Sequence, residues 1–507
     1  EGQEKDDFTT MMGGASLSYV PENRENPLYM KFLASTYQSD ENERIDIIGD
    51  YTLGQINSDL GSEDYGEIVA VLGQGIQHQF VRNYLTSNVT NVEFKGGLEI
   101  SKKKEEIFNL TEDEEEGEDE EEVSTSHFLQ WGIKYQNEII NDKLNEWERL
   151  DSAGYSLPFS ESDVFLQYVL KTENNLNSNR FSAYFQDSYL YEKDSFSMKV
   201  SYGVRASYWS MNKEFVYSPR VQMLLKPRTK EDISFRFATG MYNQPPFYRE
   251  MRRLDGTVNR DLKAQKSIHA VAGYNWDFKW GDIPFRFTSE IYYKHLWDLV
   301  SYDLDNVRIR YSGENNATGY VTGIDLRLNG EFVPGEESWV NLSFLRARES
   351  FNDVQHYQFE VGSVDSVLVN TVARPTDQFM SLSMFFQDHL PKQKSLKMHL
   401  NLTVGTGWPF GVPNNNVGPR NTYRFSPYHR VDIGFSAKLW NEEWLERRPK
   451  HPLRFTKHTW LSLEVFNLLQ VSNQASNTWI RITTGRQYAV PNYLTSRRIN
   501  LRLRMEF

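Results

Sequence analysis

The last nine residues of the chain constrain its fold more than any other feature. Apolar and polar side chains alternate there without exception, the apolar ones being Ile499, Leu501, Leu503, Met505 and Phe507. Alternation with a period of two is typical of a β-strand with one face in an apolar medium and the other in a polar one. The sequence therefore predicts a final strand that ends on an aromatic residue.

The same alternation recurs in four upstream segments, at residues 196–206, 285–293, 396–404 and 431–439. Strands of a soluble sandwich also alternate, but they usually have only about 5–6 residues. The segments here are close to the roughly 9–11 residues that a tilted strand needs to cross a membrane. The pattern predicts an all-β fold, an antiparallel transmembrane β-barrel. We expect Arg502, Arg504 and Glu506 to face its lumen, and Leu501, Leu503 and Met505 to face lipid.

The connections between these strands alternate in length. Short ones fall at residues 191–195, 226–231, 279–283, 333–336 and 389–395, and longer ones at 141–178, 244–266, 298–316, 349–375 and 408–428. Membrane barrels have short periplasmic turns and long external loops. Two connections depart from this rule: residues 212–214 are short on the outer side, and residues 441–456 form a longer, charged periplasmic turn.

We expect about 17 strands, the first near Thr10, whereas bacterial single-chain barrels have an even number. The N-terminal third is the hardest part to assign. Residues 43–60 are predicted to form a helical insert in an external loop. Residues 66–101 fit either one long strand or a hairpin.

Composition excludes several classes of protein. Cysteine is absent, which rules out disulfides and thiolate catalysis. The net charge is -13, and ten acidic residues between Glu112 and Glu122 account for most of it. An acidic chain with no basic stripe is not expected to bind nucleic acid. The chain opens at Glu1-Gly2-Gln3 without a signal peptide, so we expect a mature form or a piece of a longer protein.

Several segments resemble strands of a known family of membrane proteins. Residues 180–187 (RFSAYFQD), 429–435 (HRVDIGF) and 461–468 (LSLEVFNL) resemble strands of TonB-dependent receptors, and residues 243–249, 307–315 and 335–341 are similar to receptors of the Bacteroidota. The resemblance covers nearly the whole chain and implies a barrel of about 22 strands around a plug. Residues 1–507 are then a single, partial outer-membrane barrel domain with an acidic insert at 102–125. The resemblance therefore implies that the N-terminal strands and the plug are missing from this chain.

The resemblance implies a function and partners. The chain is expected to lie in the cell outer membrane as a receptor that imports a scarce nutrient, such as an iron chelate, a glycan or a peptide. Its expected partners are outer-membrane lipid, the missing strands and plug, surface lipoproteins, and an energy-transducing periplasmic protein that acts through the plug. No cofactor is implied. Two alternatives stay open: a scaffold barrel that has lost transport, and a plugless porin.

Six residues in external loops are candidates for ligand binding: Phe247, Tyr248, Arg252, Arg253, Arg308 and Arg310. Aromatic faces and guanidinium groups suit an anionic or ring-bearing ligand. The alternative is that these loops pack on their neighbours and that the arginines form salt bridges.

No catalytic or metal-binding constellation appears in the sequence. The GxSxG, HExxH and GxxxxGK[ST] patterns are absent, and the histidines are scattered. The acidic run at 112–122 has carboxylates that suit calcium or a basic partner, but it lacks the spacing of a calcium loop. A self-repelling loop is the alternative. We therefore expect neither an enzyme nor a metal site.

Overall fold

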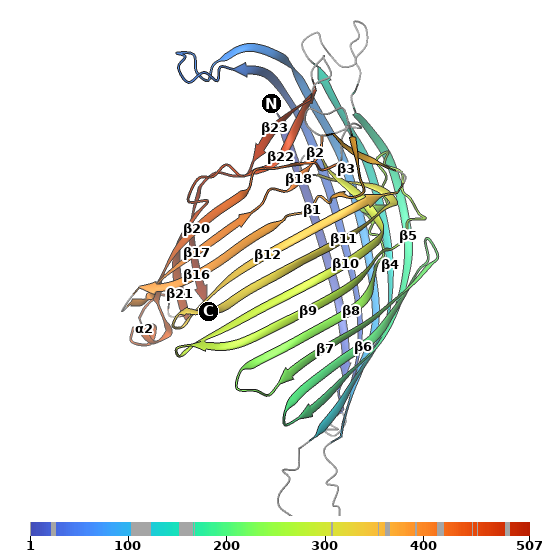
Figure 1. Ribbon diagram of the computed structural model, residues 1–507, viewed down its shortest axis with the longest axis vertical. Coiled ribbons are helices and arrows are strands. Elements are labelled where there is room, and N and C mark those ends of the chain that lie inside the picture. The colour runs from blue at the N-terminus through green and yellow to red at the C-terminus, as the bar shows by residue number, and fades with distance from the viewer. Residues whose placement is uncertain are drawn as a thin grey trace, which may run out of the picture.

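A long antiparallel sheet makes up most of the computed structural model (Figure 1). The structure describes residues 2–506 except 22–26, 103–122, 152–165, 167, 306–307, 353, 360–365, 391–392, 413–419, 449, 454 and 482–486. The sheet contains 18 strands. They are β1 (Gly2–Tyr19), β2 (Leu28–Ile56), β3 (Ile68–Lys102), β4 (Ser124–Asp151), β5 (Tyr168–Lys193), β6 (Phe196–Trp209), β7 (Glu214–Pro227), β8 (Asp232–Gln244), β9 (Gln265–Trp280), β10 (Ile283–Asp305), β11 (Arg308–Val333), β12 (Glu336–Phe351), β15 (Val372–Ala373), β16 (Met380–Leu390), β17 (Gln393–Gly405), β20 (Tyr428–Trp440), β21 (His458–Phe466) and β24 (Arg498–Glu506).

The strands pair in chain order. Each strand from β1 to β12 pairs with the next, and the series continues through β16, β17, β20, β21 and β24, while the two-residue β15 adds to β12. The sheet curves round, so that β1 and β2 are seen behind β10–β12 (Figure 1). The predicted all-β antiparallel barrel wall is confirmed, with 17 strands in the meander plus β15.

The remaining elements are short and lie in connections. Three hairpins join neighbouring segments: β13 (His356–Phe359) with β14 (Ser366–Val369), β18 (Pro409–Phe410) with β19 (Tyr423–Arg424), and β22 (Gln474–Arg481) with β23 (Gln487–Tyr493). The helices are α1 (Tyr248–Met251) and α2 (Glu442–Glu446). Within the described part of the chain, no helix is long and apolar enough to span a membrane.

The predicted alternation of connections is largely confirmed. Every predicted short connection falls between two consecutive strands, as at β5–β6, β7–β8, β9–β10, β11–β12 and β16–β17. The β6–β7 turn is short on the opposite, outer end, also as predicted. The charged periplasmic turn between β20 and β21 contains α2, where Asn441 caps the helix by accepting a hydrogen bond from the Trp444 amide.

Two predictions about the outer connections are wrong, and one open alternative is decided. Residues 43–60 are not a helix, because they continue β2 as far as Ile56 and pair with β3 along its length. Of the two alternatives for residues 66–101, the structure has the single long strand, β3. Residues 298–316 are not a loop but the end of a β10–β11 hairpin. In the two wrong predictions, cross-strand pairing outweighs the local pattern of the sequence.

The two faces of the final strand differ as predicted. Arg502 on β24 forms an ion pair with Glu464 on β21, 3.1 Å apart, and Asn500 donates to the same carboxylate at 2.9 Å. Leu501 and Leu503 lie opposite Leu463 and Leu461 on the other face, where they are exposed. Phe507 lies outside the described residues.

The acidic run 112–122 lies outside the described residues, but the strands on either side of it are described. Lys102 at the end of β3 pairs with Thr125 on β4, and Ser124 pairs with Glu192 beside the short β5–β6 turn. The chain therefore leaves β3 and enters β4 at the end of the sheet that carries the short turns. In a membrane barrel, the end with the short turns is the periplasmic end.

Candidate functional site at the outer mouth

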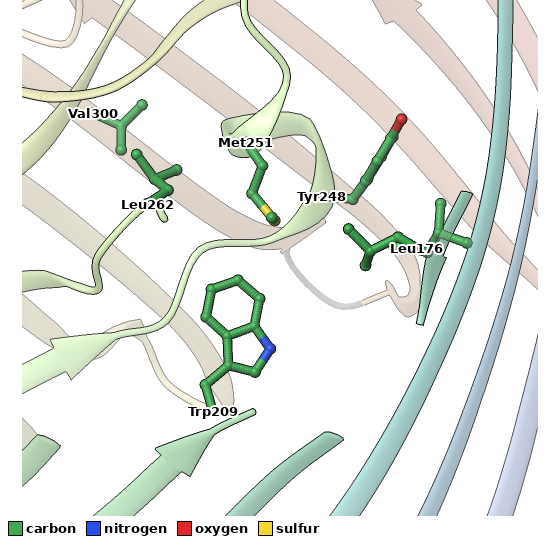
Figure 2. Packing of buried hydrophobic residues seen from close by; sticks show 7 residues of the cluster. Leu176, Trp209, Tyr248, Met251, Leu262 and Val300 are labelled. Atoms are coloured by element: carbon green, nitrogen blue, oxygen red, sulfur yellow. The ribbon is translucent and has the colours of Figure 1, made fainter. Parts of the chain in front are cut away.

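The β8–β9 loop, residues 245–264, folds against strands that are not its neighbours in the sheet. Its residues Tyr248, Met251 and Leu262 form a buried cluster with Ile140, Leu176, Trp209 and Val300 from β4, β5, β6 and β10 (Figure 2). Burying an apolar side chain of this size stabilises a structure by about 1.5–3 kcal/mol. The loop therefore has a small hydrophobic core of its own at the outer end of the barrel.

Hydrogen bonds from the wall fix the backbone of this loop. Arg180 donates to the Pro246 carbonyl at 2.6 Å, Asn174 to the Gly256 carbonyl at 2.9 Å, and Asn212 to the Leu262 carbonyl at 2.7 Å. Gly256 has φ +83°, and a Cβ there would meet Thr172 at 2.6 Å, so only glycine fits. The loop is thus held in one conformation by β5, which carries Arg180 and Asn174, and by the β6–β7 turn, which carries Asn212.

Asp142 on β4 is the buried anchor of helix α1. Its carboxylate accepts a hydrogen bond from the Tyr248 hydroxyl at 2.6 Å and forms an ion pair with Arg252 at 3.1 Å. Burial and the adjacent carboxylate raise the pKa of Tyr248, so its hydroxyl stays protonated and donates. The polar groups of Tyr248 and Arg252 are thus already bonded to Asp142 of the barrel wall.

Glu250 is a second buried carboxyl on α1. It accepts hydrogen bonds from the Phe247 amide at 3.3 Å and from the Gln265 side chain at 2.7 Å. Burial raises its pKa above the ordinary value of 4.5, although these hydrogen bonds and the charge of Arg180 oppose the change. The docked loop therefore favours the protonated carboxyl.

The β10–β11 hairpin reaches across to the strands at the start of the sheet. Arg308 forms an ion pair with Glu43 on β2 at 2.6 Å, and Arg308 and Arg310 approach Glu146 on β4 at 4.0 and 3.5 Å. Asn83 on β3 donates to both carboxylates, at 2.9 and 2.6 Å. Strands β2–β4 and β10–β11 are far apart in the pairing order, so these contacts span the hollow side of the curved sheet.

Three side chains of this region remain open to solvent. Phe247 is 40% exposed and meets Tyr311 edge-on. The Arg249 side chain is 57% exposed and forms an ion pair with Glu41 at 2.9 Å, and Arg253 forms one with Glu314 at 3.4 Å. Exposed ion pairs contribute about 0–1 kcal/mol, so an anionic ligand can exchange with the carboxylates. The arrangement presents one aromatic face and two exchangeable guanidinium groups.

The structure brings the six predicted residues into one region, at α1 and the β10–β11 hairpin. All four predicted arginines have a carboxylate partner within 4.0 Å, as the salt-bridge alternative predicts. Sequence reasoning missed Glu43, Asp142 and Glu146, because they are more than 100 residues from the arginines they meet. Arg249 was also missed. Its position in the same loop, between the predicted residues Tyr248 and Arg252, is the signal that could have identified it.

Fold and site together define an outer-membrane barrel whose outer mouth is spanned by its own loops. The family comparison agrees: residues 7–468 match the model described as TonB dependent receptor-like, beta-barrel. The chain belongs to this family of receptors. It is accordingly a protein of the cell outer membrane and not an enzyme.

The solved structures that are similar to this chain are distant from it in sequence. The chain is 10% identical to the RagAB peptide transporter (TM-score 0.48), covering 91% of this chain and 58% of that one. It is 12% identical to the outer membrane transporter YddB from Escherichia coli (TM-score 0.45; 99% and 76% covered). It is 13% identical to the ferric yersiniabactin uptake receptor FyuA from Yersinia pestis (TM-score 0.46; 99% and 71% covered). No curated protein matches the sequence.

Proposed function

We propose that this chain forms the wall of an outer-membrane receptor that imports a scarce nutrient, with energy supplied by an inner-membrane complex. Family membership supports the receptor class. The observation that carries the proposal is the outer mouth, where α1 and the β10–β11 hairpin are tied to β2 and β4. A mouth spanned by fixed loops suits selective capture better than free diffusion.

The accessible groups at the mouth narrow the ligand class. Phe247 offers a stacking face, while Arg249 and Arg253 offer positive charge that an anionic group attracts. An iron chelate, an acidic glycan and a peptide carboxylate all carry such groups. The proposed partners are an energy-transducing periplasmic protein, acting through a plug, and a surface lipoprotein.

Uptake measurements in cells test the proposal. Cells that produce the full receptor are compared with cells lacking it, with and without an agent that dissipates the proton-motive force. We expect uptake of an anionic nutrient that stops when the force is dissipated. Uptake that continues without energy would favour the porin alternative. The scaffold alternative would be favoured by two results together: no uptake under either condition, and loss of a larger outer-membrane complex in the cells that lack the receptor.

A pair of variants connects uptake to the mouth. Arg249→Ala with Arg253→Ala removes both exposed cations and should raise the nutrient concentration needed for half-maximal uptake by roughly tenfold, about 1.4 kcal/mol. Arg228→Ala is the control, because Arg228 lies at the periplasmic β7–β8 turn and forms an ion pair of similar exposure with Glu192. Equal uptake by the two variants would show that Arg249 and Arg253 do not contribute to ligand binding.

A further inference from the structure

The inner face of strands β7–β10 carries three basic side chains at one level of the wall. Strand pairing places Arg220, Gly240, His269 and Lys294 directly opposite one another, in a row that crosses these strands. Residues that lie opposite each other project from the same face of a sheet. The row therefore presents a guanidinium, an imidazole and an ammonium group along one line, with a glycine between the first two.

This face borders the lumen. Arg236 and Glu290 lie on the same face as the row, and they form an ion pair with each other. At alternate positions of the same strands, Phe237, Ile291 and Tyr293 are 45%, 57% and 50% exposed. A membrane barrel turns such an apolar face to lipid and its polar face to the interior. The row of basic residues therefore lines the hollow side of the wall.

A tyrosine fixes two members of the row in place. The Arg220 guanidinium lies 4.2 Å from the centre of the Tyr242 ring, and the His269 ring stacks on the same tyrosine with its centroid 4.2 Å away. Glycine at position 240 makes room for this arrangement, because a Cβ there would meet Cγ of Arg220 at 2.8 Å. The Ser267 hydroxyl lies 2.9 Å from Nε2 of His269. The two basic groups are thus held in one geometry before a ligand binds.

The cations of the row have no acidic partner in the described part of the chain. Arg220 and Lys294 form no ion pair there, whereas all four predicted arginines of the outer mouth do. Positive groups without counter-charges on a low-dielectric wall attract anions. Of the carboxylates on the same face, Glu290 pairs with Arg236, Glu214 with Lys266 and Asp277 with Arg286, while Asp325 lies four residues nearer to the periplasmic turns than the row.

The row lies just inside the outer mouth. His269 is four residues from Gln265, the first residue of β9, and Tyr242 is two residues from Gln244, the last residue of β8. These strand ends carry the β8–β9 loop, which contains the exposed cations of the mouth. The row is therefore the next group of unpaired cations inward from that loop on these strands.

We propose that this row binds a small polyanion, a ligand with several carboxylate or phosphate groups. The guanidinium of Arg220 can hold one such group by two parallel hydrogen bonds, and Lys294 supplies a second charge for another group of the same ligand. Because Arg220 is already held by Tyr242, little side-chain freedom is lost on binding. The inference rests on the proposed function only for entry of the ligand through the mouth, since binding itself requires no energy supply.

Titration calorimetry of the purified full receptor tests this site. Arg249→Ala with Arg253→Ala is the background, so that the exposed cations of the mouth do not bind the probes, which are citrate and inorganic pyrophosphate. We expect at least one probe to bind, with an affinity that falls as salt is added. Binding of citrate alone identifies carboxylates as the ligand chemistry, and binding of pyrophosphate alone identifies phosphates. Binding of neither probe overturns the proposal.

A pair of double variants, made in the same background, locates the bound probe. Arg220→Gln with Lys294→Gln should weaken binding by roughly tenfold or more, since it removes both unpaired cations. Arg236→Gln with Arg286→Gln is the matched control: it removes the same charge from the same face, but each of these arginines is already paired with a carboxylate. Equal affinity in the two double variants would also overturn the proposal.

Thermal unfolding distinguishes a ligand site from a contact inside the receptor. The probe should raise the unfolding temperature of the background protein but not that of Arg220→Gln with Lys294→Gln. Without a probe, removing two like charges should leave the unfolding temperature unchanged or higher. A lower temperature without the probe, together with no stabilisation of the background protein by the probe, would show that the row holds another segment of the receptor instead.

Discussion

Arg502 and Leu503 are adjacent residues whose surroundings are opposite. Arg502 reaches the buried carboxylate of Glu464, while Leu503 lies exposed on the other face, opposite Leu461. The strict alternation of residues 499–507 predicts this difference, because a strand turns successive side chains to opposite faces. Pattern alone did not reveal Glu464 as the partner, since that contact depends on the register of β21 against β24.

Exchanging these two residues tests which face meets lipid. Leu503→Arg places a charge in hydrocarbon and should destabilise the barrel by about 2–4 kcal/mol if it lies near the midplane. Arg502→Leu leaves Glu464 with Asn500 as a donor and should cost only about 1 kcal/mol. Urea unfolding of each variant in lipid vesicles provides the measurement. Equal stability of the two variants would contradict the assignment of faces.

Glu250 gives the outer loop a dependence on pH. Its pKa is raised in the docked loop, so the docked state binds the proton more tightly than a released loop does. As the pH rises above the ordinary value of 4.5, the released loop loses its proton first, and docking weakens. Hydrogen exchange of residues 245–264 should therefore become faster relative to intrinsic rates as the pH rises. Glu250→Gln should remove this part of the dependence; an unchanged profile would show that Glu250 does not contribute.

At the scale of elements, short turns were predictable and outer connections were not. Turns such as β9–β10 follow two clear alternating segments, so local pattern locates them. The outer ends of β2, β4 and β11 carry charged residues that pair across the hollow of the sheet. A polar strand end of this kind has the composition of a loop, and it forms a strand only because it pairs with residues far along the chain. The carboxylates of the mouth, Glu43, Asp142 and Glu146, were missed for the same reason: the arginines that they contact are far away in the sequence.

The anchor of α1 has a direct test at Asp142. Asp142→Leu removes the acceptor of Tyr248 and the counter-charge of Arg252, leaving two partly buried polar groups without this partner. The loss should weaken docking of residues 245–264 by about 2–4 kcal/mol, seen as faster hydrogen exchange. Asp255→Asn is the control within the same loop, because Asp255 is exposed and bonds only to Thr257 nearby. Comparable exchange in the two variants would show that Asp142 is not the anchor.

At the scale of the whole molecule, strand direction decides how the barrel closes. The meander has 17 strands, so β1 and β24 run in the same direction, from the outer end towards the periplasmic end. Among the described residues, β1 pairs only with β2, and β24 only with β21. Closure by antiparallel pairs requires an even number of strands, and an unpaired edge in hydrocarbon costs several kcal/mol per backbone group. The directions of β1 and β24 do not allow a direct antiparallel seal between them, and closure by antiparallel pairs alone would require an odd number of further strands in between.

Engineered disulfides test this conclusion cleanly, because the sequence contains no cysteine. Ser16→Cys with Leu33→Cys is the positive control: the two residues lie directly opposite each other on β1 and β2, as a disulfide requires. Ser16→Cys combined with Cys at Leu501, Leu503 or Arg504 should not cross-link in the membrane, because other strands separate β1 from β24. Efficient cross-linking in any of these pairs would mean that the two strands are neighbours. The wall would then close on itself through a parallel pair, and the self-sufficient porin would become the better description of the molecule.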